Sequence, residues 1–421
     1  MEASGEVVII GGGIGGLTLA LALHRAGIGF RVYEAAREIK PLGVGLNLLP
    51  HAMRELAGLG LEAELRAKGI ETKEYCFFTR NGQLVQREPR GLYAGYEWPQ
   101  IAIHRADLHL TLLEAVRARA GEDAVLLGHK CTAVEQDEHA AIVHFADAAT
   151  GEALPPVRGT VAIACDGVHS VARGQMHPKE AVPRYEGTTQ YRGTTRWKPY
   201  LSGATHFYLG TYETGKLVMY PIRNDIDGQG TQLINWVIEV SRPADKLLRD
   251  WNRRSRVEEF IGDFEHCSFD WLDIPALMRA ADAVYEYPMI DQDPLPFWTD
   301  GRITLLGDAA HPMMPRGSNG SAHAIIDATT LAGLLASEGD PRAALKLYEQ
   351  RRLQATGNVV LANREIAPDA ILRVVEERTG GKPFQRIEDV ISTRELEEWQ
   401  ARYKKVAGFA REDLASSGVR A

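Results

Sequence analysis

The stretch that decides the fold is Val7-Val8-Ile9-Ile10-Gly11-Gly12-Gly13-Ile14-Gly15-Gly16, followed by an apolar, helix-like run to Gly27 and by Phe30-Arg31-Val32-Tyr33-Glu34. The order is strand, glycine turn, helix, strand and acid, which is the fingerprint of a βαβ unit that binds an adenine dinucleotide. Gly11 permits the tight turn, Gly13 lets a pyrophosphate approach the backbone, and Gly16 lets the helix pack closely on the strand. The helix N-terminus offers unpaired N–H groups to the anion. Glu34 can accept hydrogen bonds from ribose hydroxyls, which favours FAD or NAD over a cofactor with a 2′-phosphate.

Composition narrows the class of protein. A chain of 421 residues is long enough for two domains and a tail. Hydrophobic residues make up 45% and charged residues 25%, as in soluble globular proteins. The net charge of −8, without a long basic block, makes nucleic acid an unexpected partner. The four cysteines are far apart and lack CxxC spacing, so we expect no disulfide framework, no zinc site or other metal, and a cytoplasmic location. No membrane-spanning segment is expected.

The pattern along the chain changes between two kinds of structure. The continuous apolar run at 161–165 is typical of a strand covered on both faces, and 302–306 is predicted to be another buried strand. Residues 185–240 alternate, as in an antiparallel sheet. Asn81-Gly82 predicts a hairpin that belongs with this second sheet. We therefore predict an α/β fold: a discontinuous Rossmann-like domain, an inserted antiparallel substrate domain, and a peripheral helical tail. Their predicted boundaries are 1–72, 100–180 and 285–365 for the dinucleotide domain, 73–99 and 181–284 for the substrate domain, and 366–421 for the tail.

Three features fall where strands of an open α/β sheet end, which is where such sheets bind ligands. They are the glycine turn, Asp166-Gly167 and Gly307-Asp308. The third opens a long motif that runs Gly307-Asp308-Ala309-Ala310-His311-Pro312-Met313-Met314-Pro315-Arg316-Gly317-Ser318-Asn319-Gly320. A carboxylate at a strand end can hold sugar hydroxyls, and glycine-rich backbone at a helix start offers N–H groups to an electron-rich, flat ligand.

These motifs resemble those of the para-hydroxybenzoate hydroxylase superfamily, the class A flavoprotein monooxygenases. The resemblance rests on the nucleotide fingerprint, on a "DG" motif at 166–173 and on a "GD" motif at 307–311, and it covers about residues 5–365. The stretches Gly43-Val44-Gly45-Leu46-Asn47, Ile103-His104-Arg105 and Tyr287-Pro288-Met289-Ile290-Asp291 look most similar to the phenazine-modifying branch. One departure is Ser318-Asn319-Gly320-Ser321-Ala322, where the family commonly has Gly-Gln-Gly-x-Asn. This difference puts side-chain contacts to the flavin at these positions in doubt.

The resemblance implies FAD as the bound cofactor and NADH or NADPH as co-substrate. It implies that the backbone from Gly13 through Ile14 and Gly15 to Gly16 holds the pyrophosphate, Glu34 the ribose and Arg105 the phosphates. Asp166 and Asp308 would contact the FAD–nicotinamide region and the ribityl chain, and Gly45 would lie beside the flavin. The isoalloxazine ring would be lined by Pro315, Gly317, Ser318, Asn319 and Gly320.

The implied reaction is hydroxylation of a small aromatic or N-heteroaromatic substrate through a flavin C4a-hydroperoxide formed from O₂. Such chemistry needs no catalytic triad and no metal. The sheet at 185–240 supplies the substrate-pocket candidates Tyr191, Arg192, Tyr220, Asn235 and Trp236, together with Pro315, although packing within the sheet is the competing explanation for these side chains. His206 and Tyr208 have weaker claims, and His311 is expected to order its loop. Arg192, Arg196 and Arg316 are possible partners of a substrate carboxylate.

Two other functions stay open from sequence alone: a flavin-dependent oxidase or reductase without oxygen insertion, and a catalytically idle FAD-binding protein. The intact Asp166 and Asp308 argue against the idle protein. A monomer or a homodimer is expected.

Overall fold

The computed structural model describes residues 5–40, 43–180, 184–241, 253–366 and 368–417. Its first layer is a six-stranded sheet in the order β21-β22-β12-β1-β2-β8. The bounds of these strands are Thr299–Asp300, Ile303–Leu305, Val161–Ala164, Val7–Ile10, Phe30–Tyr33 and Val125–Leu126. All neighbours pair in parallel except the edge strand β21. The central strands β1 and β12 are buried along their whole length, so their apolar runs follow from coverage on both faces.

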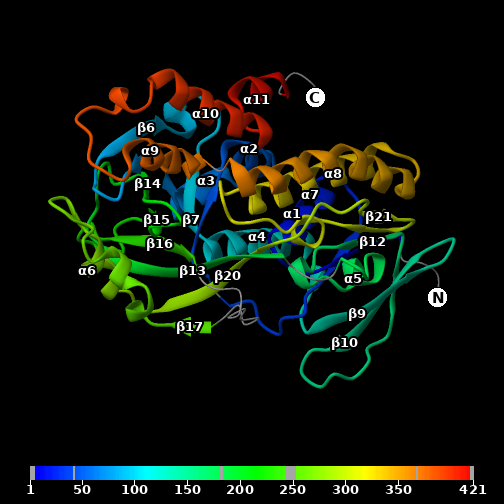
Figure 1. Cartoon of the computed structure of the whole chain (residues 1–421). Helices are drawn as coiled ribbons and strands as arrows, with labels where there is room; N and C mark the ends of the chain where they lie inside the picture. The colour runs from blue at the N-terminus through cyan, green and yellow to red at the C-terminus, as the bar shows by residue number, and fades with distance from the viewer. Residues whose placement is uncertain (1–4, 41–42, 181–183, 242–252, 367, 418–421) are drawn as a thin grey trace.

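Long helices cover one side of this sheet, and a short helix and the strands of residues 129–159 cover the other (Figure 1). The first helix, α1 (Ile14–Arg25), packs against α7 (Gly320–Ser337) and α4 (Arg105–Ala120), and α8 (Pro341–Glu365) packs against α7. The smaller helices of this part are α2 (Pro50–Gly58), α3 (Glu62–Lys68) and α5 (Val171–Met176). Two small sheets flank it: β3-β7-β4 (Gly45–Leu48, Ile101–His104, Ile70–Glu71) and β11-β10-β9 (Val157–Gly159, Ala141–Asp147, His129–Gln136). Strands β9 and β10 form an antiparallel hairpin, and α7 and α8 are the two longest of the helices described.

The second layer is an eight-stranded sheet in the order β17-β20-β13-β16-β15-β14-β5-β6. Its strands are Arg253–Ser255, Val284–Asp291, Arg184–Trp197, Gln232–Ser241, Lys216–Arg223, Thr205–Leu209, Glu74–Phe78 and Leu84–Pro89. The Asn81-Gly82 hairpin joins β5 to β6, as predicted. The sheet is not wholly antiparallel, because β5 returns beside β14 in parallel register. Strand β20 also pairs with β13 here, although the sequence pattern predicts that residues from 285 onward belong to the dinucleotide domain. Where one domain ends and the next begins stays a prediction.

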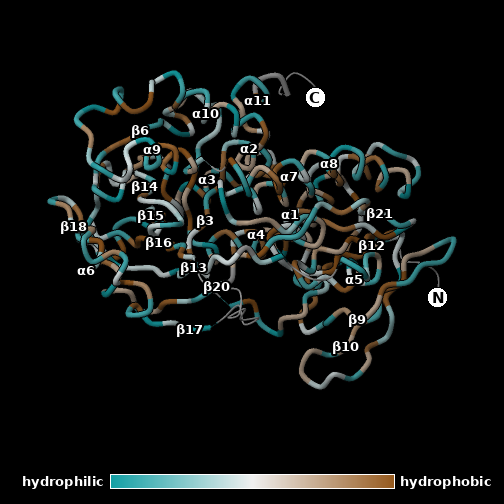
Figure 2. Tube along the Cα trace, in the orientation of Figure 1, coloured by the Kyte–Doolittle hydropathy of each residue, from teal (hydrophilic) through white to brown (hydrophobic). Residues whose placement is uncertain are grey.

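The outer face of this sheet packs on short elements that follow it. They are the 3-10 turns η5 (Val257–Glu259) and η6 (Ile261–Phe264), the β18-β19 hairpin (Ser268–Phe269, Leu272–Asp273) and α6 (Ile274–Arg279). Tyr191, Phe207, Trp236 and Phe260 are among the side chains buried between them. Figure 2 shows apolar residues gathered along the inner strands and helices, with polar residues on the outer loops. Among the described residues, no helix combines the length and apolarity that crossing a bilayer requires.

The C-terminal segment is not peripheral, which corrects our expectation from its many charges. It forms η8 (Pro368–Ala370), α9 (Ile371–Thr379), η9 (Ile387–Asp389), α10 (Thr393–Val406) and α11 (Arg411–Ser417). These helices lie over the end of the molecule that carries β6 and β14 (Figure 1). Ile371, Leu372, Val375, Ile391 and Leu396 share a core with Tyr75, Phe77, Val85 and Tyr208 of the eight-stranded sheet. The apolar anchors are sparse but sit on one face of each helix, so a few suffice to dock the segment.

Candidate functional site

A cavity of about 630 Å³ lies between the carboxyl ends of the parallel strands and the inner face of the eight-stranded sheet. Its volume is within the ~300–1,000 Å³ of small-molecule sites, and its position is the one at which open α/β sheets bind ligands. The structure brings most of the predicted site residues to it. They are Gly13, Ile14, Gly15, Gly45, Arg105, Asp166, Arg192, Tyr220, Asp308, Pro315, Gly317, Ser318, Asn319 and Gly320.

The glycine turn divides into structural and cavity-facing positions. Gly11 has a φ of +101°, and a Cβ there would collide with the carbonyl of Cys165. A Cβ on Gly16 would collide with the carbonyl of Gly11, so these two glycines shape the turn and do not line the cavity. At Gly13, which caps α1, a Cβ would meet no described atom within 4 Å. The helix N-terminus is therefore open to a ligand, and its N–H groups favour an anion.

Glu34 and Asp166 stand at the ends of β2 and β12. The Glu34 carboxylate accepts hydrogen bonds from the Gly12 and Ala36 amides, at 2.6 and 2.7 Å, and it does not line the main cavity. Asp166 accepts from the Val171 amide at 2.9 Å through Oδ2, while its buried Oδ1 has no hydrogen-bond partner among the described residues. Burial raises the pKa of Asp166. An orphaned carboxylate oxygen beside a cavity is the kind of atom that a bound polar ligand satisfies.

The turn at Gly307-Asp308 is held from behind by buried charges. Asp327 of α7 accepts from the Gly307 amide at 3.4 Å and from the ring of His311 at 2.6 Å. Arg352 of α8 donates to the other Asp327 oxygen at 2.6 Å. Asp308 is exposed to the cavity. His311 is buried behind the turn, so it orders the loop, as its sequence context indicates.

The loop from Pro315 to Gly320 is fastened to the C-terminal segment. Asn319 donates through Nδ2 to the hydroxyl of Tyr403, on α10, at 2.6 Å, and that hydroxyl donates to Asn363 at 2.8 Å. Gly317 has a φ of +67°, and a Cβ there would overlap the Tyr403 hydroxyl. The Asn319 side chain therefore binds Tyr403. This agrees with the sequence difference at this position, which argues against a contact between the Asn319 side chain and the flavin.

Gly45 connects the small β3-β7-β4 sheet to the large one. Its amide donates to the Asn235 side chain at 2.8 Å, and a Cβ on Gly45 would lie 2.8 Å from Asn235 and from Ile222. Asn235 is fully buried and does not line the cavity, so it positions Gly45. Arg105, which begins α4 beside Gly43, is exposed along the cavity.

Three of the pocket candidates do not line the cavity, namely Asn235, which is described above, and Tyr191 and Trp236. Tyr191 and Trp236 lie in the core on the outer face of the sheet, and the Trp236 indole donates to Thr195 at 3.0 Å. Successive residues of a strand point to opposite faces, so placing Arg192 in the cavity directs Tyr191 away from it. The same alternation brings in residues that the sequence reading missed or gave little weight. They are Gln190, His206, Tyr208, Lys216, Val218, Val237, Glu239, Tyr287 and Met289.

The sheet-side wall of the cavity carries buried charges. Lys216 lies 3.1 Å from Glu239 and 2.7 Å from Asp369 of η8, and Arg316 Nε lies 3.9 Å from Glu239. Burial alone would lower the pKa of Lys216, but Asp369 and Glu239 outweigh it and raise that pKa. Burial would raise the pKa of Glu239, but Lys216 and Arg316 lower it. Both groups are therefore charged near neutral pH.

Arg192 differs from these paired ions. Its guanidinium donates to Gln190 Oε1 at 2.9 and 2.5 Å and lies 5.4 Å from the centre of the Tyr287 ring. None of the contacts that the described residues give it is a carboxylate. Burial lowers the pKa of Arg192, and the more distant charge of Glu239 opposes this shift without cancelling it. An arginine keeps its charge in proteins, so Arg192 is a cation in the cavity wall that could bind an anionic ligand.

The cavity fits FAD at its parallel-sheet side. The open helix N-terminus at Gly13 suits an anion, and Asp166 Oδ1 and the exposed Asp308 suit hydroxyl groups. The backbone at Gly45 and Gly317 lines the same cavity. These are the donors and acceptors that a dinucleotide with a flavin ring requires.

Comparison with known proteins agrees with this geometry. Residues 4–261 and 289–362 match the family model described as "FAD binding domain". A phenazine 1,6-dicarboxylic acid hydroxylase of Lysobacter antibioticus is 40% identical over 363 residues, which cover 86% of this chain and 89% of that protein. A 6-hydroxynicotinate 3-monooxygenase of Bordetella bronchiseptica is 30% identical over 85% of this chain and 90% of that protein. The crystal structure of Klebsiella pneumoniae HpxO with FAD and uric acid has the same fold, with a TM-score of 0.70 and 24% identity over 98% of this chain and 95% of that one.

A family model that matches most of the chain and a relative at 40% identity agree with the three strand-end motifs and the cavity between them. The chain therefore belongs to the FAD-binding family of flavoprotein aromatic hydroxylases, and it is an FAD-dependent, NAD(P)H-using monooxygenase.

Proposed function

We propose that this monooxygenase hydroxylates a small planar aromatic or N-heteroaromatic carboxylic acid, and that Arg192 binds the carboxylate. The observation that carries the proposal is the guanidinium of Arg192, which lines the cavity without a carboxylate partner among its described contacts. A cation held in a partly buried site is costly unless an anion joins it. Arginine also suits a planar carboxylate, because its donors form a rigid fork.

The substrate would lie between aromatic side chains of the sheet. Tyr220 and Tyr287 line the cavity beside Arg192, and each has its pKa raised by burial. The ring of His206 lies 4.3 Å from that of Tyr220 and 4.4 Å from that of Tyr75. These rings pack against one another, so together they form an aromatic wall that suits a flat ligand.

We also propose that His206 forms a hydrogen bond with a polar group of the substrate. It is 2% exposed and lines the cavity, and neither ring nitrogen has a hydrogen-bond partner among the described residues. Burial lowers its pKa well below the ordinary value, with Arg90 and Lys216 adding to the effect, so the imidazole is neutral. A neutral imidazole can accept a hydrogen bond from a substrate hydroxyl or N–H.

We propose the following residues for FAD. The amides at Gly13, Ile14 and Gly15 would hold the pyrophosphate, in a turn shaped by Gly11 and Gly16, with Arg105 as counter-charge. Glu34 would approach the adenosine ribose, and Asp166 and Asp308 the sugar-like chain. Gly45 and the backbone at Pro315, Gly317, Ser318, Asn319 and Gly320 would line the ring. When bound, FAD takes electrons from NAD(P)H and activates O₂ for transfer to the substrate. The chain positions the substrate ring and excludes water from it.

The relatives point the same way, since the two named above act, by their names, on aromatic acids: a phenazine dicarboxylic acid and a hydroxynicotinate. We also propose a cytoplasmic location, which the four unpaired cysteines support, because thiols persist in a reducing compartment.

Ligand binding to Arg192→Met tests the proposal. Aromatic acids and their neutral carboxamides are titrated into the oxidised, FAD-loaded enzyme, and Kd is read from the change in flavin absorbance. A hydrogen bond to a charged group contributes about 1.5–3 kcal/mol, so we expect the Kd of the acid to rise roughly ten- to a hundredfold and that of the amide to change little.

Arg196→Met is the matched control. Arg196 is on the same strand but exposed and outside the cavity lining, so its loss should leave Kd within about twofold. Equal effects of the two substitutions, or tighter binding of amides than of acids by the wild type, would contradict an acid-binding role for Arg192.

A further inference from the structure

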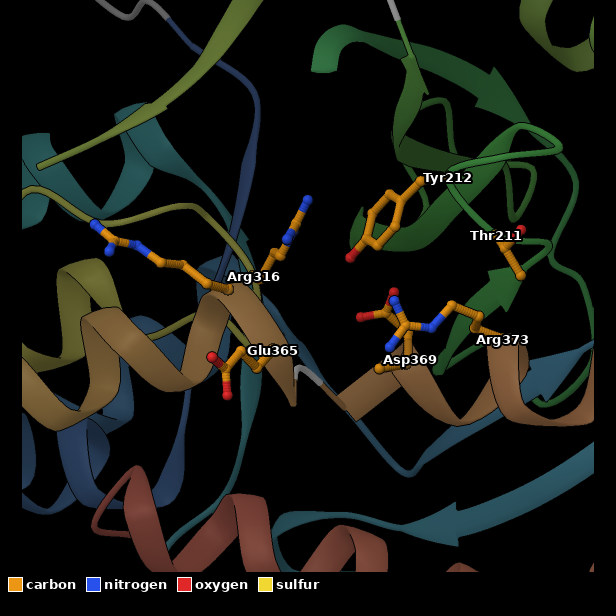
Figure 3. A pocket seen from close by; sticks show the side chains of 8 residues that line it. Thr211, Tyr212, Arg316, Glu365, Asp369 and Arg373 are labelled. Carbon is orange, nitrogen blue, oxygen red and sulfur yellow. The ribbon is translucent and has the colours of Figure 1, made fainter. Parts of the chain in front are cut away.

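One wall of the cavity is closed by the C-terminal segment. Asp369, in η8, is 5% exposed and lies 2.7 Å from the ammonium of Lys216. It lines the cavity together with Lys216, Glu239 and Arg316. Figure 3 shows the same junction from the side of a smaller pocket, where Tyr212 points toward Asp369. Asp369 lies beyond residue 362, where the match to the family model ends.

The charges on this wall cancel. Lys216 and Arg316 are its cations, and Glu239 and Asp369 are its carboxylates. Arg105, Asp166 and Asp308 lie along the part of the cavity proposed for FAD. Arg192 is then the one cation of the described sheet-side lining that lacks a carboxylate among its described contacts. Without Asp369, Glu239 would be the one carboxylate facing both Lys216 and Arg316, and the wall would carry one net positive charge.

We infer that Asp369 determines substrate specificity: by neutralising Lys216 it makes the cavity a site for one carboxylate and disfavours the dicarboxylate of the same ring. The inference rests on the proposed function, because it assumes that the substrate is an aromatic acid. A second carboxylate placed near the wall would meet Asp369 and Glu239 and would lose its water without gaining a free cation. Burying an unpaired charge in this way is strongly unfavourable.

The docking of the segment makes this wall rigid. Tyr403 holds Asn319 and Asn363, Gln400 of α10 donates to the Pro368 carbonyl at 3.2 Å, and Lys404 pairs with Glu88 of β6. The Pro368 contact fixes η8, and with it the Asp369 carboxylate. A fixed carboxylate cannot swing away to let Lys216 accept a second anion.

The test compares Kd values of matched acids for the oxidised holoenzyme, read from flavin absorbance without turnover. The pairs are phenazine-1-carboxylate with phenazine-1,6-dicarboxylate, nicotinate with pyridine-2,5-dicarboxylate, and benzoate with terephthalate. We expect the wild type to prefer the monocarboxylate. Asp369→Asn should tighten binding of the dicarboxylate by about tenfold or more relative to its monocarboxylate, because Glu239 alone then faces Lys216 and Arg316 and the wall carries one net positive charge.

Two further variants make the result specific. The double variant Asp369→Asn/Lys216→Met should not bind the dicarboxylate more tightly than the wild type does, since Arg316 and Glu239 then balance each other's charge. Glu239→Gln removes the other carboxylate of this wall, so it should also shift the preference toward the dicarboxylate. This variant serves as the test if Asp369→Asn does not fold. The inference would be overturned if both Asp369→Asn and Glu239→Gln kept the wild-type preference, or if the wild type preferred dicarboxylates. Binding of monocarboxylates would in that case still support the proposed function. Failure of every acid to bind would overturn the proposed function and the inference together.

Discussion

Three histidines are buried in the neutral form. His51, His206 and His323 are each at most 3% exposed. Burial, with Arg352 and Arg54 nearby, lowers the pKa of His51 to about 3, and burial lowers the pKa values of His206 and His323 well below the ordinary value. In the unfolded chain their pKa values return to about 6.5. Between these limits the unfolded state binds protons that the folded state does not.

Stability should therefore fall on acidification below pH 6.5 and be unaffected by these histidines above it. For His51, whose folded-state pKa of about 3 lies below this range, the loss at pH 5 is about 2 kcal/mol, from ~1.4 kcal/mol per pH unit. For His51→Leu, we expect the free energy of unfolding to drop between pH 7 and 5 by about 2 kcal/mol less than for the wild type. Urea denaturation followed by tryptophan fluorescence measures this. Substitution of the exposed His24 by Leu is the control, and equal pH slopes for wild type and His51→Leu would refute the assignment.

Single residues also show what the sequence could and could not predict. Alternation at 185–240 correctly predicted strands, but aromatic side chains occur on both faces of this sheet, so Tyr191 and Trp236 were assigned to the wrong one. The distinguishing signal was polar: Gln190, Arg192, Lys216 and Glu239 share the cavity face by register. A buried sheet face that carries charged residues must face a cavity or partner ions, because it cannot be an apolar core.

Among the elements, α10 has the largest consequence for the site. Its Tyr403 hydroxyl is the hydrogen-bond partner of Asn319, in the loop proposed to line the isoalloxazine ring. The sequence predicted the helices of this segment but not their docking, because contacts such as Tyr403–Asn319 join residues 84 positions apart. Nothing in local periodicity encodes such a pairing.

For Tyr403→Phe, we expect FAD binding to weaken. The change removes the hydrogen-bond partner of the Asn319 Nδ2 and Asn363 Oδ1 atoms, both of which are buried. A buried polar group without a partner costs about 1–3 kcal/mol, so we expect the Kd of FAD to rise roughly tenfold or more. Fluorescence quenching of free FAD on titration with apoprotein gives that Kd. Tyr96→Phe is the matched control, because the Tyr96 hydroxyl donates at 2.8 Å to the Phe409 carbonyl and so fastens the segment without reaching the loop. A similar loss of FAD affinity in both variants would assign the effect to docking alone.

At the scale of the whole molecule, three strand-end motifs converge on one cavity that a second sheet covers and the C-terminal segment closes. The motifs could be recognised from sequence because each needs particular residues at fixed local spacing: glycine at a positive φ, or an acid directly after a buried strand. The residues of the opposite wall of the cavity could not be recognised from sequence, because their arrangement in space is set by packing. They come from strands β13, β14, β15, β16 and β20 and from η8.

Turnover under oxygen-18 gas tests the central claim most directly. The purified, FAD-loaded enzyme is supplied with NADH or NADPH and with the aromatic acid that binds most tightly, and the product is analysed by mass spectrometry. A monooxygenase that hydroxylates the ring should give a product with one oxygen-18 atom, formed with consumption of NAD(P)H. Consumption of NAD(P)H with an aromatic product that is altered but contains no oxygen-18 would show an enzyme that oxidises or reduces its substrate without inserting oxygen, and would contradict the assignment.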